Sequence, residues 1–131
     1  MAGFFLDTNV VVYAFTRDRR AARAEELLTL GGTISVQVLN EFANVARRKL
    51  GMTWREVSDA SAAVRVLCGK VLRLDVDDHA EALRLADAHG FTIYDALVLA
   101  SALRGGCEVL YTEDMQDGML LDGRLRLVNP F

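Results

Sequence analysis

Short apolar runs alternate with longer amphipathic segments along this chain. The apolar runs lie at 4–6, 33–35, 71–74, 107–112 and 125–128, and they predict buried β-strands. The segments between them repeat apolar residues at three- and four-residue spacing, and they predict helices over 21–30, 38–50, 52–70, 78–89 and 92–100. Strands that alternate with helices predict an α/β fold, here a three-layer α/β/α sandwich with a mainly parallel central sheet.

Several of the predicted helices carry end signals. Thr53, followed three residues later by Glu56, predicts a capping box at the start of the helix over 52–70. Asp77 or Asp78 is the predicted N-cap of the next helix, and Gly90 is expected to close that helix. The last helix is apolar nearly all round, so we expect it to be buried.

The length and composition are those of one ordinary domain. The chain has 131 residues, of which 52% are hydrophobic, and no repeat or linker-like stretch, so we expect a single domain over 1–131. The apolar runs are too short to cross a membrane and the start does not resemble a secretory signal, which favours a cytoplasmic protein. Cys68 and Cys107 are isolated from each other and from both histidines, so we expect buried apolar residues rather than a zinc site.

Five acidic residues stand where the predicted elements would bring them to one edge of the sheet. They are Asp7 after the first strand, Glu41 at the border of the apolar face of the second helix, Asp95 in the first turn of the last helix, and Asp114 and Asp117 in the turn after the strand over 107–112. Ligands of parallel α/β sheets bind beyond the carboxyl ends of the strands. We therefore predict one carboxylate cluster.

The residue types in this cluster indicate the chemistry. Carboxylates without histidine or thiolate partners suit a hard cation, Mg²⁺ or Mn²⁺, which commonly binds them together with phosphate oxygens. Such a cation can activate water and stabilise the leaving oxygen of an in-line displacement, so the pattern favours phosphodiester hydrolysis. The net charge of −3 does not favour a nucleic-acid binder, but two divalent cations would bring it to +1 (−3 + 4).

Three of these acids also have a plain structural interpretation. Asp7 could cap a first helix, and the helix dipole favours an acid in the position of Asp95 whatever its function. Glu41 could pair with Arg48 on a solvated helix face. A haloacid-dehalogenase-like phosphatase is a further alternative, but the second aspartate that such enzymes need two residues after the first is Asn9 here.

The ordered set of motifs resembles the PIN domain family. The motifs are Asp7-Thr8-Asn9 after the first strand, Glu41 within 39–42, Asp95 within 94–97, and Thr112-Glu113-Asp114 after a late strand. Together they span essentially the whole chain. A free-standing PIN domain of this length resembles a VapC-type toxin, the ribonuclease half of a type II toxin–antitoxin pair. The resemblance implies a divalent-metal-dependent endoribonuclease, a cognate antitoxin partner and a homodimer.

The resemblance also implies roles for individual residues. The acids that match three of the family's metal ligands are Asp7, Glu41 and Asp95, and the polar residues that match its supporting side chains are Asn9 and Thr112. The fourth acid is open among Glu113, Asp114 and Asp117, in the order Asp114, then Asp117.

Basic residues gather in two stretches that could bind an RNA backbone. They are Arg17, Arg19, Arg20 and Arg23 in the first stretch, and Arg47, Arg48 and Lys49 in the second. An ordinary solvated face is the alternative for each of them. We expect Met52 and Trp54 to lie in the core rather than in an antitoxin groove. A non-catalytic PIN-like module that binds RNA or protein is the alternative function.

Overall fold

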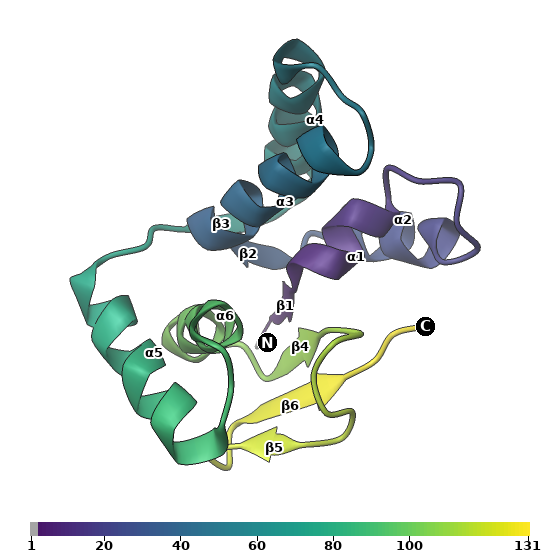
Figure 1. Cartoon of the computed structure of the whole chain (residues 1–131). Helices are drawn as coiled ribbons and strands as arrows, with labels where there is room; N and C mark the ends of the chain where they lie inside the picture. The colour runs from purple at the N-terminus through teal and green to yellow at the C-terminus, as the bar shows by residue number, and fades with distance from the viewer. Residues whose placement is uncertain (1–2) are drawn as a thin grey trace.

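A six-stranded sheet forms the middle of the molecule, which a computed structural model describes over residues 3–131 (Figure 1). The strand order is β3-β2-β1-β4-β6-β5. The strands are β1 (Phe4–Leu6), β2 (Thr33–Ser35), β3 (Lys70–Leu72), β4 (Val109–Tyr111), β5 (Leu120–Leu121) and β6 (Leu125–Val128). Neighbouring strands are parallel except for β5, which is antiparallel to β6. The predicted α/β fold with a mainly parallel sheet is confirmed.

Helices flank this sheet on both sides. They are α1 (Thr8–Tyr13), α2 (Ala21–Thr29), α3 (Val36–Arg48), α4 (Trp54–Leu67), α5 (Val76–His89) and α6 (Ile93–Arg104). In Figure 1, α1 to α4 gather in the upper half, whereas α5 and α6 lie side by side in the lower left. Within residues 3–131, no helix is both long and apolar enough to cross a membrane.

The first helix follows β1 directly. The apolar run from Val10 to Tyr13 continues as helix α1 instead of as strand, because Asp7 has an extended backbone and accepts a hydrogen bond from the backbone N–H of Thr8. Val10 and Val11 belong to this helix, and their side chains are buried in the core. The capping role considered for Asp7 is therefore real, and it places the Asp7 carboxylate at the carboxyl end of β1.

The helix ends agree with the sequence at Thr53 and at Gly90, which ends α5 in the left-handed conformation, and differ at the start of α5. Thr53 and Glu56 form the predicted capping box, with each side chain accepting from the other residue's backbone N–H. The prediction that Asp77 or Asp78 caps α5 is wrong. Asp75 is the N-cap and Asp78 is the third helical residue, because Asp75 and Asp78 form a capping box of their own.

Asp78 also makes the main buried ion pair of the fold. Its side chain is 2% exposed, and Oδ1 lies 2.6 Å from Nε of Arg104 at the end of α6. Nη2 of Arg104 donates to the other carboxylate oxygen at 3.0 Å and to the carbonyl of Arg73. This cluster ties the start of α5 to the end of α6 and to the chain after β3.

Helix α6 lies in the core, as its uniformly apolar sequence predicts. Every residue over 96–103 is buried. Cys68 and Cys107 are also buried and free, as expected, and burial raises the pKa of both thiols, that of Cys68 to about 11. Thiols with raised pKa values are poor nucleophiles at neutral pH, so neither cysteine is suited to catalysis.

Candidate functional site

The parallel register brings the ends of β1 and β4 together. Leu6 is paired with Tyr111, and the backbone N–H of Asp7 donates to the carbonyl of Tyr111 at 3.0 Å. Asp7 and Thr112, the residues that follow, therefore lie side by side beyond the carboxyl ends of these strands. This edge is where α/β folds bind ligands.

Asp7 is the most enclosed acid at this edge, with 4% of its surface exposed. Oδ1 accepts from the backbone N–H of Thr8 at 2.7 Å, and Oδ2 accepts from the Thr112 hydroxyl at 2.8 Å. Burial, together with the smaller effect of the charges of Asp95 and Glu41, raises the pKa of Asp7 to about 7, against the lowering effect of these hydrogen bonds. The carboxylate is therefore held in place but lacks a compensating positive charge.

Asn9 connects Asp7 with the loop after β4. Its amide nitrogen lies 3.3 Å from Oδ2 of Asp7 and 3.0 Å from Oδ2 of Asp114. Its amide oxygen accepts from the backbone N–H of Glu113 at 3.2 Å. Thr112 adds a further connection, because its hydroxyl oxygen accepts from the backbone N–H of Asp114. The supporting positions predicted for Asn9 and Thr112 thus lie between Asp7 and Asp114.

Glu41 projects from the middle of α3 and is oriented by the side chains of Thr8 and Gln37. Oε2 accepts from the hydroxyl of Thr8 at 2.9 Å, and Oε1 accepts from the amide of Gln37 at 2.9 Å. Gln37 lies one helical turn before Glu41, so its i,i+4 spacing could have indicated this contact. The contact with Thr8 depends on tertiary packing of α1 against α3.

Asp95 occupies the first turn of α6, where its backbone N–H donates to the Thr92 hydroxyl. Burial raises the pKa of Asp95, and repulsion by Asp114 and then by Glu41 raises it further. Acids from the end of β1, from α3, from α6 and from the loop after β4 therefore lie at a single site, where they repel one another.

The three acids in the loop after β4 lie in different surroundings. The side chain of Asp114 contacts Asn9 and repels Asp95. Glu113 points instead to Tyr13 and Arg20, and Asp117 accepts a hydrogen bond from the backbone N–H of Asn129. Of the three candidates for the fourth acid, Asp114 is thus the one beside the other three acids.

A pocket of about 300 Å³ opens onto this site. It is lined by Thr8, Asn9, Val12, Tyr13, Glu41, Val45, Lys49 and Asp114. Lys49 places one positive charge on the wall of an otherwise acidic pocket. The predicted RNA contacts Arg17, Arg19 and Arg48 are exposed, whereas Arg20 is partly enclosed by ion pairs.

The side chains present fit a hard divalent cation. Within residues 3–131, no three His, Cys, Asp or Glu side chains stand close enough to form a complete ligand set. Mg²⁺ does not require one, because it usually keeps several waters and takes one or two carboxylates. Burial raises the pKa of both Asp7 and Asp95, and repulsion by the neighbouring acids adds to the rise. A cation would relieve that repulsion.

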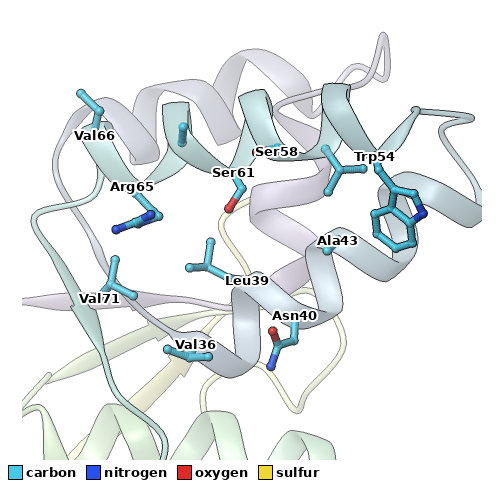
Figure 2. Close-up of a pocket in the computed structure, with 12 residues that line it drawn as sticks. Val36, Leu39, Asn40, Ala43, Trp54, Ser58, Ser61, Arg65, Val66 and Val71 are labelled. Atoms are coloured by element: carbon cyan, nitrogen blue, oxygen red, sulfur yellow. The ribbon is translucent and has the colours of Figure 1, made fainter.

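A larger cavity, of about 970 Å³, lies between α3 and α4 (Figure 2). Its lining is mostly apolar and includes Val36, Leu39 and Val66, with Arg65 directed across it. Trp54 lies at one end of this α3–α4 groove and is 65% exposed, so the prediction that it belongs to the core is wrong. The guanidinium of Arg47 covers its ring, 4.9 Å from the centroid. Met52 is partly buried against the core, as expected.

Comparisons of sequence agree with this arrangement. The family model of the PIN domain matches residues 4–116. No curated protein sequence matches the chain significantly.

Three solved structures resemble the fold. VapC20 of Mycobacterium tuberculosis, described as a sarcin-ricin loop cleaving toxin, is 23% identical, with a TM-score of 0.70 over 85% of this chain and 89% of that one. A toxin–antitoxin complex from Klebsiella pneumoniae is 20% identical, with a TM-score of 0.72 over 99% and 98% of the two chains. VapBC2 of Rickettsia felis, bound to a DNA fragment from its promoter, is 18% identical, with a TM-score of 0.63 over 95% and 96%.

Proposed function

The chain belongs to the PIN domain family, and from this premise we propose that it is a divalent-metal-dependent endoribonuclease that acts as the toxin of a type II toxin–antitoxin module. One observation carries the proposal. Asp7, Glu41, Asp95 and Asp114 come from separate parts of the chain, yet they gather at the carboxyl edge of the sheet, where Thr8 joins Asp7 to Glu41, Asn9 joins Asp7 to Asp114, and the acids repel one another. Such repulsion is unfavourable unless a cation or a proton offsets it.

Asp7, Glu41, Asp95 and Asp114 are the residues that would hold the cation, one or two of them directly and the others through its bound waters. When bound, Mg²⁺ or Mn²⁺ supplies an activated water and stabilises negative charge on the scissile phosphate. Asn9 and Thr112 orient the Asp7 carboxylate, and their contacts with the loop after β4 fix its distance from Asp114.

Basic side chains near the pocket support a polyanionic substrate. Lys49 lines the pocket, and Arg48 precedes it at the exposed end of α3. Arg17 and Arg19 are exposed in the connection between α1 and α2. None of these four makes an ion pair within residues 3–131, so their charges are available to an RNA backbone.

The α3–α4 groove is the surface we propose for the antitoxin. It is apolar, open and large enough for a helical segment, and Arg65 offers a partner for an acidic side chain on that segment. Two of the similar structures contain VapBC2 or a toxin–antitoxin complex.

We also propose a homodimer, which sedimentation of the purified protein would test.

The deciding experiment is RNA cleavage by purified wild type and Asp7→Ala protein, each with Mg²⁺, Mn²⁺ or chelator. The substrates are a pool of structured RNAs that includes the sarcin-ricin loop, because a similar structure is described as cleaving it. We expect metal-dependent cleavage by the wild type alone. The products should carry 5′-phosphate and 3′-hydroxyl ends, since an activated water leaves the 2′-hydroxyl unused.

Two results would count against the proposal. Equal cleavage by folded Asp7→Ala would exclude the carboxylate site as the catalyst. A folded wild type that cuts no RNA and does not respond to divalent cations in its melting temperature would favour the non-catalytic binding module.

A further inference from the structure

Glu113 is the immediate neighbour of Asp114, but its carboxylate is turned toward Tyr13 and Arg20, away from the acidic cluster. Oε1 accepts from the hydroxyl of Tyr13 at 2.8 Å, and Oε2 lies 2.7 Å from Nε of Arg20. Tyr13 is the last residue of α1, and Arg20 is the residue before α2. The loop after β4 is therefore attached through Glu113 to both ends of the α1–α2 connection.

Arg20 is itself fixed by its surroundings. Its guanidinium lies over the Tyr13 ring, with Cζ 5.0 Å from the ring centroid. Nη1 contacts both carboxylate oxygens of Asp18 at 3.0 and 3.1 Å, and the Arg20 backbone N–H donates to Asp18 as well. The Tyr13 ring packs edge-on against Phe131, with 5.3 Å between ring centroids. Both partners of Glu113 are thus held in place by contacts that do not involve Glu113 itself.

The contacts of Glu113 lead directly to the site. Its backbone N–H donates to the amide oxygen of Asn9, and the amide nitrogen of the same Asn9 donates to Asp114. A shift of Glu113 would displace the chain on one side of Asp114 and loosen the Asn9 bridge. Residues that contact the metal ligands, without binding the metal themselves, orient those ligands and commonly control the affinity for the metal.

We propose that Tyr13 and Arg20 are positioning residues that hold Glu113, and through it the Asp114 carboxylate, at the cation site. This inference rests on the proposed function, because it assigns a role toward the same cation. It gives Arg20 a different role from the RNA contact expected from its sequence. It also makes Glu113 part of the support for the site rather than one of its ligands.

The test measures Mn²⁺ affinity by calorimetry in the absence of RNA. The variants are Tyr13→Phe, which removes one hydroxyl and keeps the packing on Phe131, and Glu113→Gln, which removes the charge that faces Arg20. Tyr111→Phe is the matched control, because its hydroxyl makes no hydrogen bond within residues 3–131. Circular dichroism establishes that each variant is folded.

We expect the Mn²⁺ dissociation constant to rise about three- to tenfold in Tyr13→Phe and in Glu113→Gln, and to stay unchanged in Tyr111→Phe. The fold-change in the double variant should be smaller than the product of the two single fold-changes, because both changes act on the position of the same side chain. At saturating Mn²⁺, Arg20→Lys should cleave RNA with the wild-type KM.

Each contrary result has a separate meaning. Wild-type Mn²⁺ affinity in folded Tyr13→Phe and Glu113→Gln would overturn the positioning role while leaving the metal site intact. A raised KM for RNA in Arg20→Lys, with Mn²⁺ affinity unchanged, would show that Arg20 contacts RNA. That result would overturn the positioning role of Arg20. If the wild type itself binds no Mn²⁺, the proposed function fails and the inference fails with it.

Discussion

The side-chain amide nitrogen of Asn9 lies 3.0 Å from Oδ2 of Asp114, although the two residues are 105 positions apart in the sequence. The same nitrogen lies 3.3 Å from Oδ2 of Asp7. One neutral donor thus spans two carboxylates that would otherwise repel each other. The bridge sets their separation without supplying the positive charge that a cation would.

Replacing Asn9 by alanine should separate the two acids. We expect Asn9→Ala to cleave RNA about 10- to 100-fold more slowly than the wild type at limiting Mg²⁺, because residues behind metal ligands commonly have effects of that size. Higher Mg²⁺ should restore part of the rate. The control is Asn44→Ala on the exposed face of α3, which should cleave at the wild-type rate. A rate for Asn9→Ala that equals the control at every Mg²⁺ concentration would show that the bridge has no role.

The raised pKa of Asp7 predicts how the metal-free protein responds to pH. Between pH 3.8 and about 7 the folded protein keeps a proton on Asp7 that the unfolded chain releases, so stability falls as the pH rises through this window. A shift from 3.8 to about 7 corresponds to about 4 kcal/mol, which is the upper limit of the effect.

Asp7→Asn removes this ionisation. In chelator at pH 8 we expect the variant to be about 1–3 kcal/mol more stable than the wild type, because asparagine places no charge in the buried site. The gain is smaller than the upper limit because asparagine loses part of the hydrogen bonding of the carboxylate. At pH 4 the two proteins should be about equally stable. Urea unfolding at both pH values measures the difference, and a less stable variant at pH 8 would contradict the crowded-charge account.

The Asp78–Arg104 pair should matter for stability and not for catalysis. Asp78→Ala leaves Arg104 without its buried partner, and we expect a loss of about 2–3 kcal/mol, at the low end for buried pairs because Arg104 is partly exposed. Asp77→Ala, an exposed acid in the same helical turn, should cost at most about 1 kcal/mol. Cleavage per folded molecule should be unchanged in both variants. Slower cleavage by folded Asp78→Ala would link this distant pair to the site.

Trp54 provides a direct report on the α3–α4 groove, because it is the only tryptophan in the chain. Binding of the cognate antitoxin in the groove should move its fluorescence emission to shorter wavelength as water leaves the ring. Trp54→Ala should weaken binding about tenfold or more, as is common for buried aromatic anchors. Leu83→Ala, an exposed apolar residue on α5, is the control. An emission spectrum that does not change on binding would place the antitoxin elsewhere.

Local patterns predicted much of the fold. The Thr53–Glu56 capping box lies where its spacing indicated, and the strands at 33–35 and 125–128 have the predicted bounds. These features depend on residues within a few positions of one another. Strand β5 was not predicted, because two residues carry too little alternation to be distinguished from a turn.

The site shows the limit of local patterns more clearly. Ordered motifs identified the acids, but the partner of Glu41 on α1 and the partners of Glu113 arise from contacts 33 to 100 positions apart. Trp54 was assigned to the core because tryptophan is usually buried. Only the packing of α4 beside α3 shows that its ring lies at an open groove.

The contact between Thr112 and Asp7 has a consequence for how the protein matures. These residues are 105 positions apart, and Thr112 follows β4, which pairs with β6 near the end of the sequence. While the ribosome is still adding residues before Thr112, the nascent chain carries Asp7 without the hydroxyl that orients it. The Asp7 carboxylate thus takes the orientation it has in the folded protein only after Thr112 has been added and β4 has paired with β1.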